Sequence, residues 1–469
     1  MREDDPLTAD AVTNPVRDED GAFRPDFLTR VTDAIAAEDR PALKQAIEGL
    51  HEADLGDLIE ALESEDDRPR LIELLGKDFD FTALTELDET IRVQILLALK
   101  PWIVADGIRD LDSDDAVYIL EDLDEDEKAD ILKYIPAPER GALERSLDYP
   151  EESAGRRMQT EFIAVPPFWT VGRVIDYLRD TADLPETFYE IFVVDPAYRL
   201  IGAVPLDKLL RTRRAVLLTA LKSEQRHVVR ADQDQEDVAR LFEHYNLVSA
   251  PVVDESNRLV GVITIDDVVD VIQEEADEDL RAMAGVGSDE ELSDSVSYTA
   301  RARLPWLIIN LGTAFLAAFI ISLFTSTIEH MVALAVLMPI VASMGGNAAN
   351  QTMTVAVRAL ATKDLTNHNA RRVVLREVLV GLCNGLVLAV LLGLIAALWF
   401  WSPELGGVIG TALVVNMLAA GLFGILIPIV IHKLKLDPAV ASGVFVTTVT
   451  DTVGFFSFLG FASLWFSFR

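Results

Sequence analysis

Five long apolar segments follow Arg303 and constrain the fold of this chain more than any other feature. We place them near residues 304–328, 331–357, 374–400, 406–432 and 439–465. A helix that rises ~1.5 Å per residue needs roughly 20 residues to cross the ~30 Å hydrocarbon core of a bilayer, and each segment exceeds that length. The sequence therefore predicts a multidomain membrane protein with an all-α domain of five transmembrane spans over residues 303–469.

The upstream part of the 469-residue chain is strongly acidic. Residues 303–469 hold nine Lys/Arg and six Asp/Glu, whereas the residues before them hold 32 and 71, which gives a charge near −39. Such a region repels phosphate, so we expect no nucleic-acid partner. Residues 1–26 have no basic segment followed by an apolar one, as a signal peptide would, and we expect a disordered acidic tail there.

The loops between the spans predict the orientation in the membrane. Basic residues near span ends stay on the cytoplasmic side. They gather before the first span, after the second and after the fourth, as Arg301, Arg303, Arg358, Lys363, Arg371, Arg372, Arg376, Lys433 and Lys435. We therefore expect a multi-pass protein of the cell (inner) membrane, surrounded by lipid, with its N-terminus in the cytoplasm and its C-terminus outside.

Residues 27–150 carry a helical pattern. Apolar residues recur at spacings of three and four in DLGDLIEALE, DETIRVQILLAL, DDAVYILEDL and EKADILKYI. Acidic residues open most of these runs, where they cap helix N-termini and complement the helix dipole. We predict an α-helical stack whose units bury one another, as in solenoids, with an irregular helical domain as the alternative.

An internal repeat occupies residues 151–273. Residues 191–210, IFVVDPAYRLIGAVPLDKLL, match residues 250–269, APVVDESNRLVGVITIDDVV, at an offset of 59. Each copy predicts two strands joined by a hairpin turn and followed by a helix. The pair resembles the tandem α/β CBS module, and we place its copies at residues 151–216 and 217–273.

The resemblance to CBS pairs implies a nucleotide site in the second copy. CBS pairs commonly hold an adenosine nucleotide with a pattern of Gly, two residues, Ser/Thr, two residues and Asp, which the second copy keeps as Gly261, Thr264 and Asp267. The first copy has Pro205 and Lys208 at the matching places. ATP held by Thr264 and Asp267 is one reading, and Thr264 as the cap of a helix that begins at Ile265 is the other.

An acidic helical segment connects the repeat to the first span. In DDVVDVIQEEADEDL, four acidic residues fall at i, i+3, i+7 and i+11 on one helical face, with two more beside it: Asp267, Asp270, Glu274 and Glu278, then Glu275 and Asp279. Like charges so close together require water or cations. We expect residues 274–302 to form a connecting helix that senses cations, with a solvated surface as the alternative.

Polar residues inside the spans point to an aqueous path. The second span places Asn347, Asn350, Gln351 and Thr354 on one face, the fourth contributes Asn416, and the fifth places Thr447, Asp451 and Gly454 at i, i+4 and i+7. Such groups are costly in lipid unless they face protein or water. We expect Asn347, Asn350, Asn416, Thr447, Asp451 and Gly454 to line a pore. A neutral Asp451 that only packs between helices is the alternative.

The chemistry of these residues favours a hard divalent cation. No Lys or Arg lies at the depth of Asp451, and a twofold dimer would bring two copies of this carboxylate across one axis. Oxygen ligands without His or Cys suit Mg²⁺, which keeps several waters and takes one or two carboxylates.

The order of these features resembles the MgtE family of magnesium channels. The resemblance rests on YPEESAGRRM, the two CBS copies, the acidic helix and the span motifs PIVASMGGNAANQ, RALATKDL, LDPAVASG and TTVTDTVGF. It implies a homodimer that admits Mg²⁺, and possible passage of other divalent cations. It also implies closure by cytosolic Mg²⁺ through the connecting "plug" helices, with ATP as a modulator.

Matched position by position, the resemblance implies metal sites at nine residues: Asp451 in the pore, and Asp114, Asp234, Glu236, Asp267, Asp270, Glu275, Glu278 and Asp279 in the cytosolic region. Two positions depart from the pattern, since Gly443 stands where some members have Asn and Asn246 where an acid can occur.

Two other classes of function remain open. A secondary transporter coupled to protons through Asp451 would show flux that depends on the proton gradient, and a membrane receptor for adenylates would bind nucleotide without moving ions. We expect no enzyme, because no span carries an HExxH pair or a Ser/Lys dyad.

Overall fold

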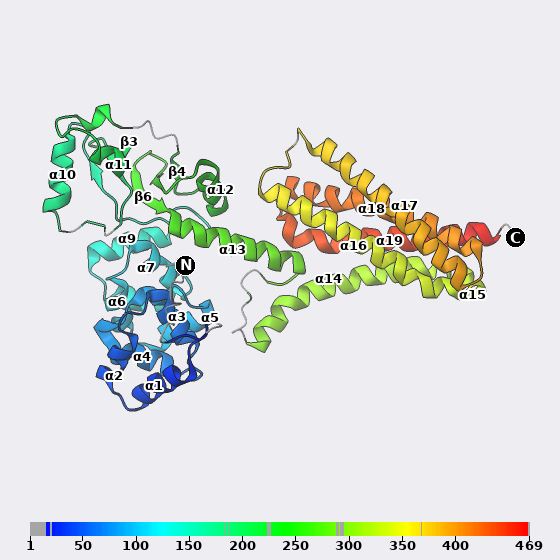
Figure 1. Ribbon diagram of the computed structural model, residues 1–469, viewed down its shortest axis with the longest axis horizontal. Helices are drawn as coiled ribbons and strands as arrows, with labels where there is room; N and C mark the ends of the chain where they lie inside the picture. The colour runs from blue at the N-terminus through cyan, green and yellow to red at the C-terminus, as the bar shows by residue number, and fades with distance from the viewer. Residues whose placement is uncertain are drawn as a thin grey trace, which may run out of the picture. The chain divides into compact units, whose positions relative to one another are not determined.

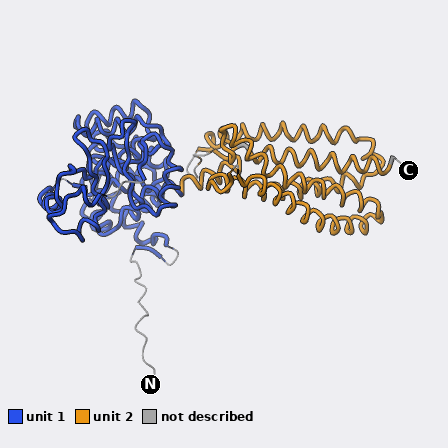
Figure 2. The backbone as a smooth tube through the Cα atoms, turned by 90° about the horizontal axis from the view of Figure 1, so that it is seen from above, with its two compact units in different colours: residues 1–272 blue, residues 273–469 orange. Residues whose placement is uncertain are grey.

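The computed structural model describes residues 16–18, 21–182, 184–185, 187–222, 227–287, 290, 295–366 and 368–467. It divides into two compact units, residues 1–272 and 273–469 (Figure 2). Most of the predicted tail lies outside the described residues. Its last part is ordered, because Arg17 pairs with Asp54 and Asp57 and Phe23 is buried, so the expected disorder up to residue 26 is too long.

The first unit begins with a helical domain, as predicted (Figure 1). The four apolar runs form α3, α5, α7 and α8, and their apolar faces share one continuous core with the neighbouring helices. The elements are α1 (Pro25–Ala36), α2 (Arg40–Ile47), α3 (Glu52–Glu60), α4 (Asp67–Leu75), η1 (Gly76–Asp78), η2 (Phe81–Leu84), α5 (Glu89–Ala98), α6 (Pro101–Ile108), α7 (Ser113–Glu121), α8 (Glu125–Leu132) and α9 (Ala137–Leu147).

Two small sheets of the same topology follow and confirm the CBS pair. In each sheet the short first strand runs parallel to the second, and the second pairs antiparallel with the third. The first copy contains β1 (Ala164–Val165), α10 (Val171–Asp180), β2 (Glu190–Val194), β3 (Leu200–Pro205), α11 (Leu206–Leu210) and η3 (Leu218–Ala220). The second contains β4 (Val229–Arg230), α12 (Gln235–Tyr245), β5 (Ser249–Val253) and β6 (Leu259–Thr264).

The two predicted hairpin turns have the same local structure and lie together. Asp195 Oδ1 accepts the backbone N–H of Arg199 at 2.9 Å, and Asp254 Oδ1 accepts that of Arg258 at 2.8 Å. Arg199 and Arg258 also form an antiparallel bridge between the two turns. The repeated Asp therefore closes each turn, and the two copies meet at equivalent places.

A single helix, α13 (Ile265–Ala284), leaves the second copy. The predicted boundary between residues 273 and 274 thus falls inside a continuous helix. The second unit continues with α14 (Val296–Ser322), α15 (Thr325–His330), α16 (Ala333–Ala361), α17 (Ala370–Trp399), α18 (Pro403–Lys433) and α19 (Pro438–Ser467).

Five helices in the described part of the chain are long and apolar enough to cross a membrane: α14, α16, α17, α18 and α19. Four of them match the predicted spans closely, whereas α14 begins earlier than the first predicted span and ends at Ser322. Figure 2 shows the long helices running side by side in this unit.

Glycines bring α17 and α18 into close contact. A Cβ atom at Gly421 of α18 would lie 2.6 Å from the carbonyl oxygen of Glu377, and one at Gly381 of α17 would lie 2.5 Å from that of Met417. Small residues allow helix backbones to approach where apolar lipid provides no driving force for association. These glycines therefore set the spacing of the two helices.

The substitution Gly421→Ala should destabilise the second unit, because the added methyl group must push α18 away from α17. Overpacking of this kind costs about 1–3 kcal/mol, so we expect a lower unfolding temperature in detergent. Gly312→Ala in α14 is the matched control, since a Cβ there meets no atom within 4 Å. An unfolding temperature of Gly421→Ala equal to that of the control would contradict the close packing.

Candidate functional site

Asp451 lies on α19 and is half-buried. Two hydroxyls near it bond inside the helix, since Thr447 Oγ1 donates to the carbonyl of Gly443 at 2.9 Å and Thr450 Oγ1 to that of Thr447 at 3.0 Å. Such bonds to the preceding turn are usual for Thr in membrane helices. No described residue forms a hydrogen bond or an ion pair with the side chain of Asp451.

A polar face runs along α16. Asn347, Asn350, Gln351 and Thr354 are exposed on the protomer, as is Thr447 of α19. In a helix of this hydropathy, an exposed row of amides cannot face acyl chains without a large cost. The protomer therefore presents a surface that requires water or more protein.

The structure gives Asn416 and Gly454 a different place from the one predicted. Asn416 is 0% exposed, and its Nδ2 donates to the carbonyl of Val341 of α16 at 2.9 Å. A Cβ at Gly454 would lie 2.8 Å from that Nδ2 atom. Both residues pack between helices of one protomer and line no exposed face of it, because the sequence pattern gives the position of a residue but not the direction of its side chain.

Glu377 is an acidic residue of α17 that the sequence analysis did not single out. It is buried, and Thr352 Oγ1 of α16 donates to its Oε2 at 3.4 Å, while Arg376 Nε lies 3.9 Å from its Oε1. Its place inside the predicted third span was a usable signal. Because basic residues of the adjoining loop lie close to it in the sequence, the position was instead interpreted as part of the cytoplasmic flank of the span.

Carboxylates from α7 and α13 crowd together in the first unit. Asp114 and Asp115 lie in the first turn of α7, and Asp266, Asp267 and Asp270 lie in the first turns of α13. Burial raises the pKa of Asp114 well above its usual value, and the charge of Asp267 adds to that effect. Burial and the neighbouring carboxylates also raise the pKa of Asp115 to about 6 and that of Asp267 to about 7.

The segment just before β1 holds these two helix starts close together. Ser113, at the start of α7, donates its hydroxyl to Glu161 at 2.7 Å and accepts the backbone N–H of Thr160 at 2.7 Å. Gln159 pairs through its backbone with Val262 of β6, just before α13. The crowding of acids is therefore built into the fold, and a cation would relieve their repulsion.

The three residues of the expected nucleotide motif have roles inside the protein. Asp267 Oδ2 accepts the hydroxyl of Thr264 at 2.9 Å and its backbone N–H at 3.3 Å, which closes the start of α13. A Cβ at Gly261 would lie 2.6 Å from the sulfur of Met158. The bond from the backbone N–H of Thr264 to Asp267 is the reciprocal half of a capping box, in which the third residue of a helix accepts the N–H of the cap residue.

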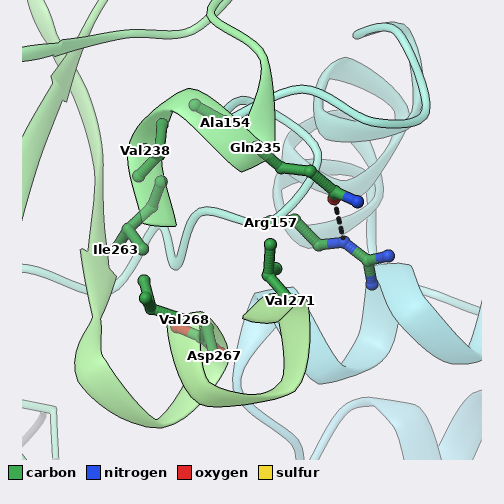
Figure 3. Close-up of a pocket in the computed structure, with 8 residues that line it drawn as sticks. All are labelled: Ala154, Arg157, Gln235, Val238, Ile263, Asp267, Val268 and Val271. Atoms are coloured by element: carbon green, nitrogen blue, oxygen red, sulfur yellow. Dashed lines mark hydrogen bonds between the residues drawn. The ribbon is translucent and has the colours of Figure 1, made fainter. Parts of the chain in front are cut away.

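A small cavity adjoins Asp267 (Figure 3). It lies among apolar side chains, including Val268 and Val271, and beside the hydrogen bond from Arg157 Nε to Gln235 Oε1 at 3.0 Å. The cavity leaves a volume of about 10 Å³ for the centre of a water molecule. That is room for about one water molecule.

The other predicted sensor residues lie at two places, the start of α12 and the second half of α13. Asp234 caps α12 by accepting the N–H of Glu236 at 2.9 Å, and Glu236 lies 3.6 Å from Arg240. Glu275 and Glu278 lie half-buried on α13. Burial and the charge of Asp437 raise the pKa of Asp279, which Arg358 opposes.

No group of three or more His, Cys, Asp or Glu side chains in the described ranges converges tightly enough to bind a bare metal ion. Mg²⁺ dehydrates reluctantly and keeps several waters, so a site of one or two carboxylates fits it without such a cluster.

The last turn of α13 belongs to the second unit and is packed within it. Ala282 is buried in a cluster with residues of α16, α18 and α19, including Met353, Ala420 and Val446. A Cβ at Gly443 of α19 would lie 3.6 Å from the carbonyl oxygen of Met283. The end of α13 therefore contacts the helix that carries Asp451.

Three family models match parts of this chain. The MgtE divalent cation transporter family matches residues 338–461, the MgtE intracellular N domain matches residues 50–152, and the CBS domain matches residues 221–274. The magnesium transporter MgtE of Bacillus subtilis is 32% identical over 398 residues, which are 84% of this chain and 88% of that protein. This chain belongs to the MgtE family.

Other MgtE proteins are similar over shorter stretches. The magnesium transporter MgtE of Thermus thermophilus is 38% identical over 315 residues, 67% of this chain and 70% of that protein. A crystal structure of the cytosolic domain of the Mg²⁺ channel MgtE in complex with ATP is 32% identical and covers 52% of this chain and 99% of that one, with a TM-score of 0.49. The predicted family and the domain types of this chain are thus confirmed.

The raised pKa values of the α7 and α13 carboxylates predict that the first unit of this MgtE protein loses stability as the pH rises. A carboxyl whose pKa is higher in the folded than in the unfolded state holds its proton longer when folded. For Asp115, with a folded pKa of about 6, this contribution to stability is present below its usual pKa and is lost as the pH rises through about 6.

We therefore expect the unfolding temperature of the full chain without Mg²⁺ to fall between pH 5 and pH 8, and added Mg²⁺ to restore it at pH 8. Asp115→Asn should flatten the pH dependence. Asp180→Asn, at the exposed end of α10, is the control. A profile of Asp115→Asn that follows the wild type would show that this carboxyl does not titrate as described.

Proposed function

We propose that this MgtE protein is a homodimeric Mg²⁺ channel whose pore runs past Asp451. The observation that carries the proposal is the half-buried Asp451 carboxylate, which no described residue pairs, on a helix with the hydropathy of a membrane span. A charge at that depth persists where water and a cation reach it. A hydrated Mg²⁺ supplies both, since it binds one or two carboxylates and keeps its other waters.

The exposed polar face of α16 supports a dimer. Asn347, Asn350 and Thr447 stay exposed on one protomer, and a twofold contact would turn them from lipid toward a second copy and an aqueous path. We include Asn347, Asn350, Thr447 and Asp451 in the pore lining. The place of Asn416 and Gly454 behind these helices supports an indirect role for both.

The distribution of basic residues supports the proposed orientation. Lys and Arg flank the start of α14, the connection between α16 and α17 and the end of α18, and basic loops stay in the cytoplasm. We infer a protein of the cell membrane with its N-terminus inside, its C-terminus outside and Mg²⁺ entering the cell.

Cytosolic Mg²⁺ closes the pore through α13 in this proposal. The acids of α7 and α13 repel one another without cations, and the end of α13 contacts α16, α18 and α19. Mg²⁺ bound among Asp114, Asp267 and Asp270, and near Asp279, would hold α13 in that place. Gly443 lies about 12 Å from Asp451 along α19, so the contact of α13 is close to the pore.

ATP binding remains a prediction. It is supported by the CBS pair and by the spacing of Thr264 and Asp267. A related cytosolic domain is known in complex with ATP. In the arrangement described here both side chains bind each other, so a nucleotide that uses them must displace that contact.

Asp451→Asn should abolish Mg²⁺ flux, because the amide keeps the shape of the side chain and loses its charge. The measurement is Mg²⁺ entry into vesicles that hold the full-length protein and a fluorescent indicator. Asn384→Ala, an exposed amide of α17, is the control and should keep wild-type flux. Normal uptake by Asp451→Asn would refute the pore assignment.

The same preparation separates a channel from a proton-coupled carrier. A channel passes single-channel Mg²⁺ currents in a patch-clamped membrane, and its flux does not depend on a proton gradient. Flux that follows the imposed proton gradient would favour the carrier.

Neutralising the acids of α13 should leave the pore open at millimolar cytosolic Mg²⁺. The variant changes Asp267, Asp270, Glu278 and Asp279 together to the corresponding amides. Current should persist where it stops in the wild type, because the cations no longer fix α13. The control neutralises four exposed acids elsewhere in the first unit, Asp130, Glu139, Asp180 and Glu243. Unchanged inhibition would mean that the acidic face of α13 serves only solvation.

A further inference from the structure

Asn416 lies where three membrane spans meet. It belongs to α18, it is 0% exposed, and its Nδ2 donates to the backbone carbonyl of Val341 of α16 at 2.9 Å. Val341 lies inside α16, two residues after Pro339. A carbonyl oxygen has two lone pairs, so this bond adds to the bonds of the helix itself. One side chain of α18 thereby holds α16.

Two glycines make room for this side chain. A Cβ at Gly345 of α16 would lie 2.1 Å from Asn416 Nδ2, and a Cβ at Gly454 of α19 would lie 2.8 Å from the same atom. Real Cβ contacts are never so short, so any other residue at either place would displace the amide. Asn416 thus fills the space that a glycine leaves on each of two neighbouring helices.

These contacts fix the two helices that carry the exposed polar groups. Gly454 lies three residues after Asp451, which is about 4.5 Å along α19 and on a neighbouring face. Gly345 lies two residues before Asn347, and residues so spaced point to opposite sides of a helix. Gly345 is accordingly buried against Asn416 while Asn347 is exposed. Asn416 therefore contacts the helix that carries Asn347 and the helix that carries Asp451.

Stability alone does not explain an asparagine at this place. No described residue donates a hydrogen bond to its Oδ1 atom, which is buried. An unpaired buried acceptor is costly, and an apolar side chain of the same shape would avoid the cost. The presence of a buried polar group with this cost therefore needs an explanation other than stability.

We propose that Asn416 is a positioning residue for Mg²⁺ passage, whose amide joins α16 and α19 to α18 and so places the Asp451 carboxylate in the pore. The inference deepens the proposed function and rests on it. It differs from a role in lining the pore, because Asn416 does not touch the ion. It acts through Asp451 and Asn347.

The test is Asn416→Ala in the full-length protein in vesicles, with flux measured against external Mg²⁺ concentration. Displacing a binding group by about 1 Å costs up to ~100-fold, so we expect the half-saturating Mg²⁺ concentration to rise by about tenfold or more. If Asn416 only contributes to packing, fewer channels survive and maximal flux falls, while the half-saturating concentration stays at the wild-type value. That outcome would overturn the inference.

Asn416→Leu provides the second variant, because it keeps the size of the side chain and removes its polar atoms. It should unfold at or above the wild-type temperature and still show the raised half-saturating concentration. Asn384→Ala of α17 is the matched control, and both of its parameters should equal those of the wild type. Wild-type Mg²⁺ affinity in Asn416→Leu refutes the positioning role alone, whereas a wild type without any Mg²⁺ flux refutes the proposed function and this inference with it.

Discussion

The cost of a polar group in hydrocarbon governs the membrane unit of this protein. Glu377 meets that cost by burial against Thr352, and the hydroxyls of Thr447 and Thr450 meet it by bonds to the preceding turn of α19. Asn416 meets it in part, with one bond to α16 and an oxygen that no described residue pairs. Asp451 and the amides of α16 have no such solution within a protomer, and the proposed dimer, pore and hydrated ion all follow from that difference.

Repulsion between carboxylates has the corresponding role in the first unit. The fold brings the starts of α7 and α13 together through Ser113, Thr160 and the pairing of Gln159 with Val262, although both helices begin with acids. Crowded in this way, the carboxylates favour protonation or cation binding over remaining ionised without a counter-ion. One continuous helix, α13 from Ile265 to Ala284, carries both this acidic start and an end that packs against α16, α18 and α19.

Much of the architecture was predictable because it depends on local pattern. Apolar periodicity located the helices of the first domain, the offset of 59 located the two CBS copies, and hydropathy located the spans. The shared Asp of the two hairpins was also visible as Asp195 and Asp254. Local pattern was less informative where one residue type serves two purposes, as for Thr264 and Asp267, which fit both a nucleotide motif and a helix cap.

The sequence by itself determined which segments are long and apolar enough to span a membrane, where basic residues gather between them and that Asp451 has no basic partner at its depth, since these depend on composition and order along the chain. Only the tertiary structure decided which polar side chains face outward and which lock helices together. Asn347 and Asn416 are both asparagines inside long apolar helices, yet the side chain of Asn347 is exposed and that of Asn416 is fully buried. The direction of a side chain depends on the rotation of its helix against its neighbours, and glycines far apart in the sequence set that rotation.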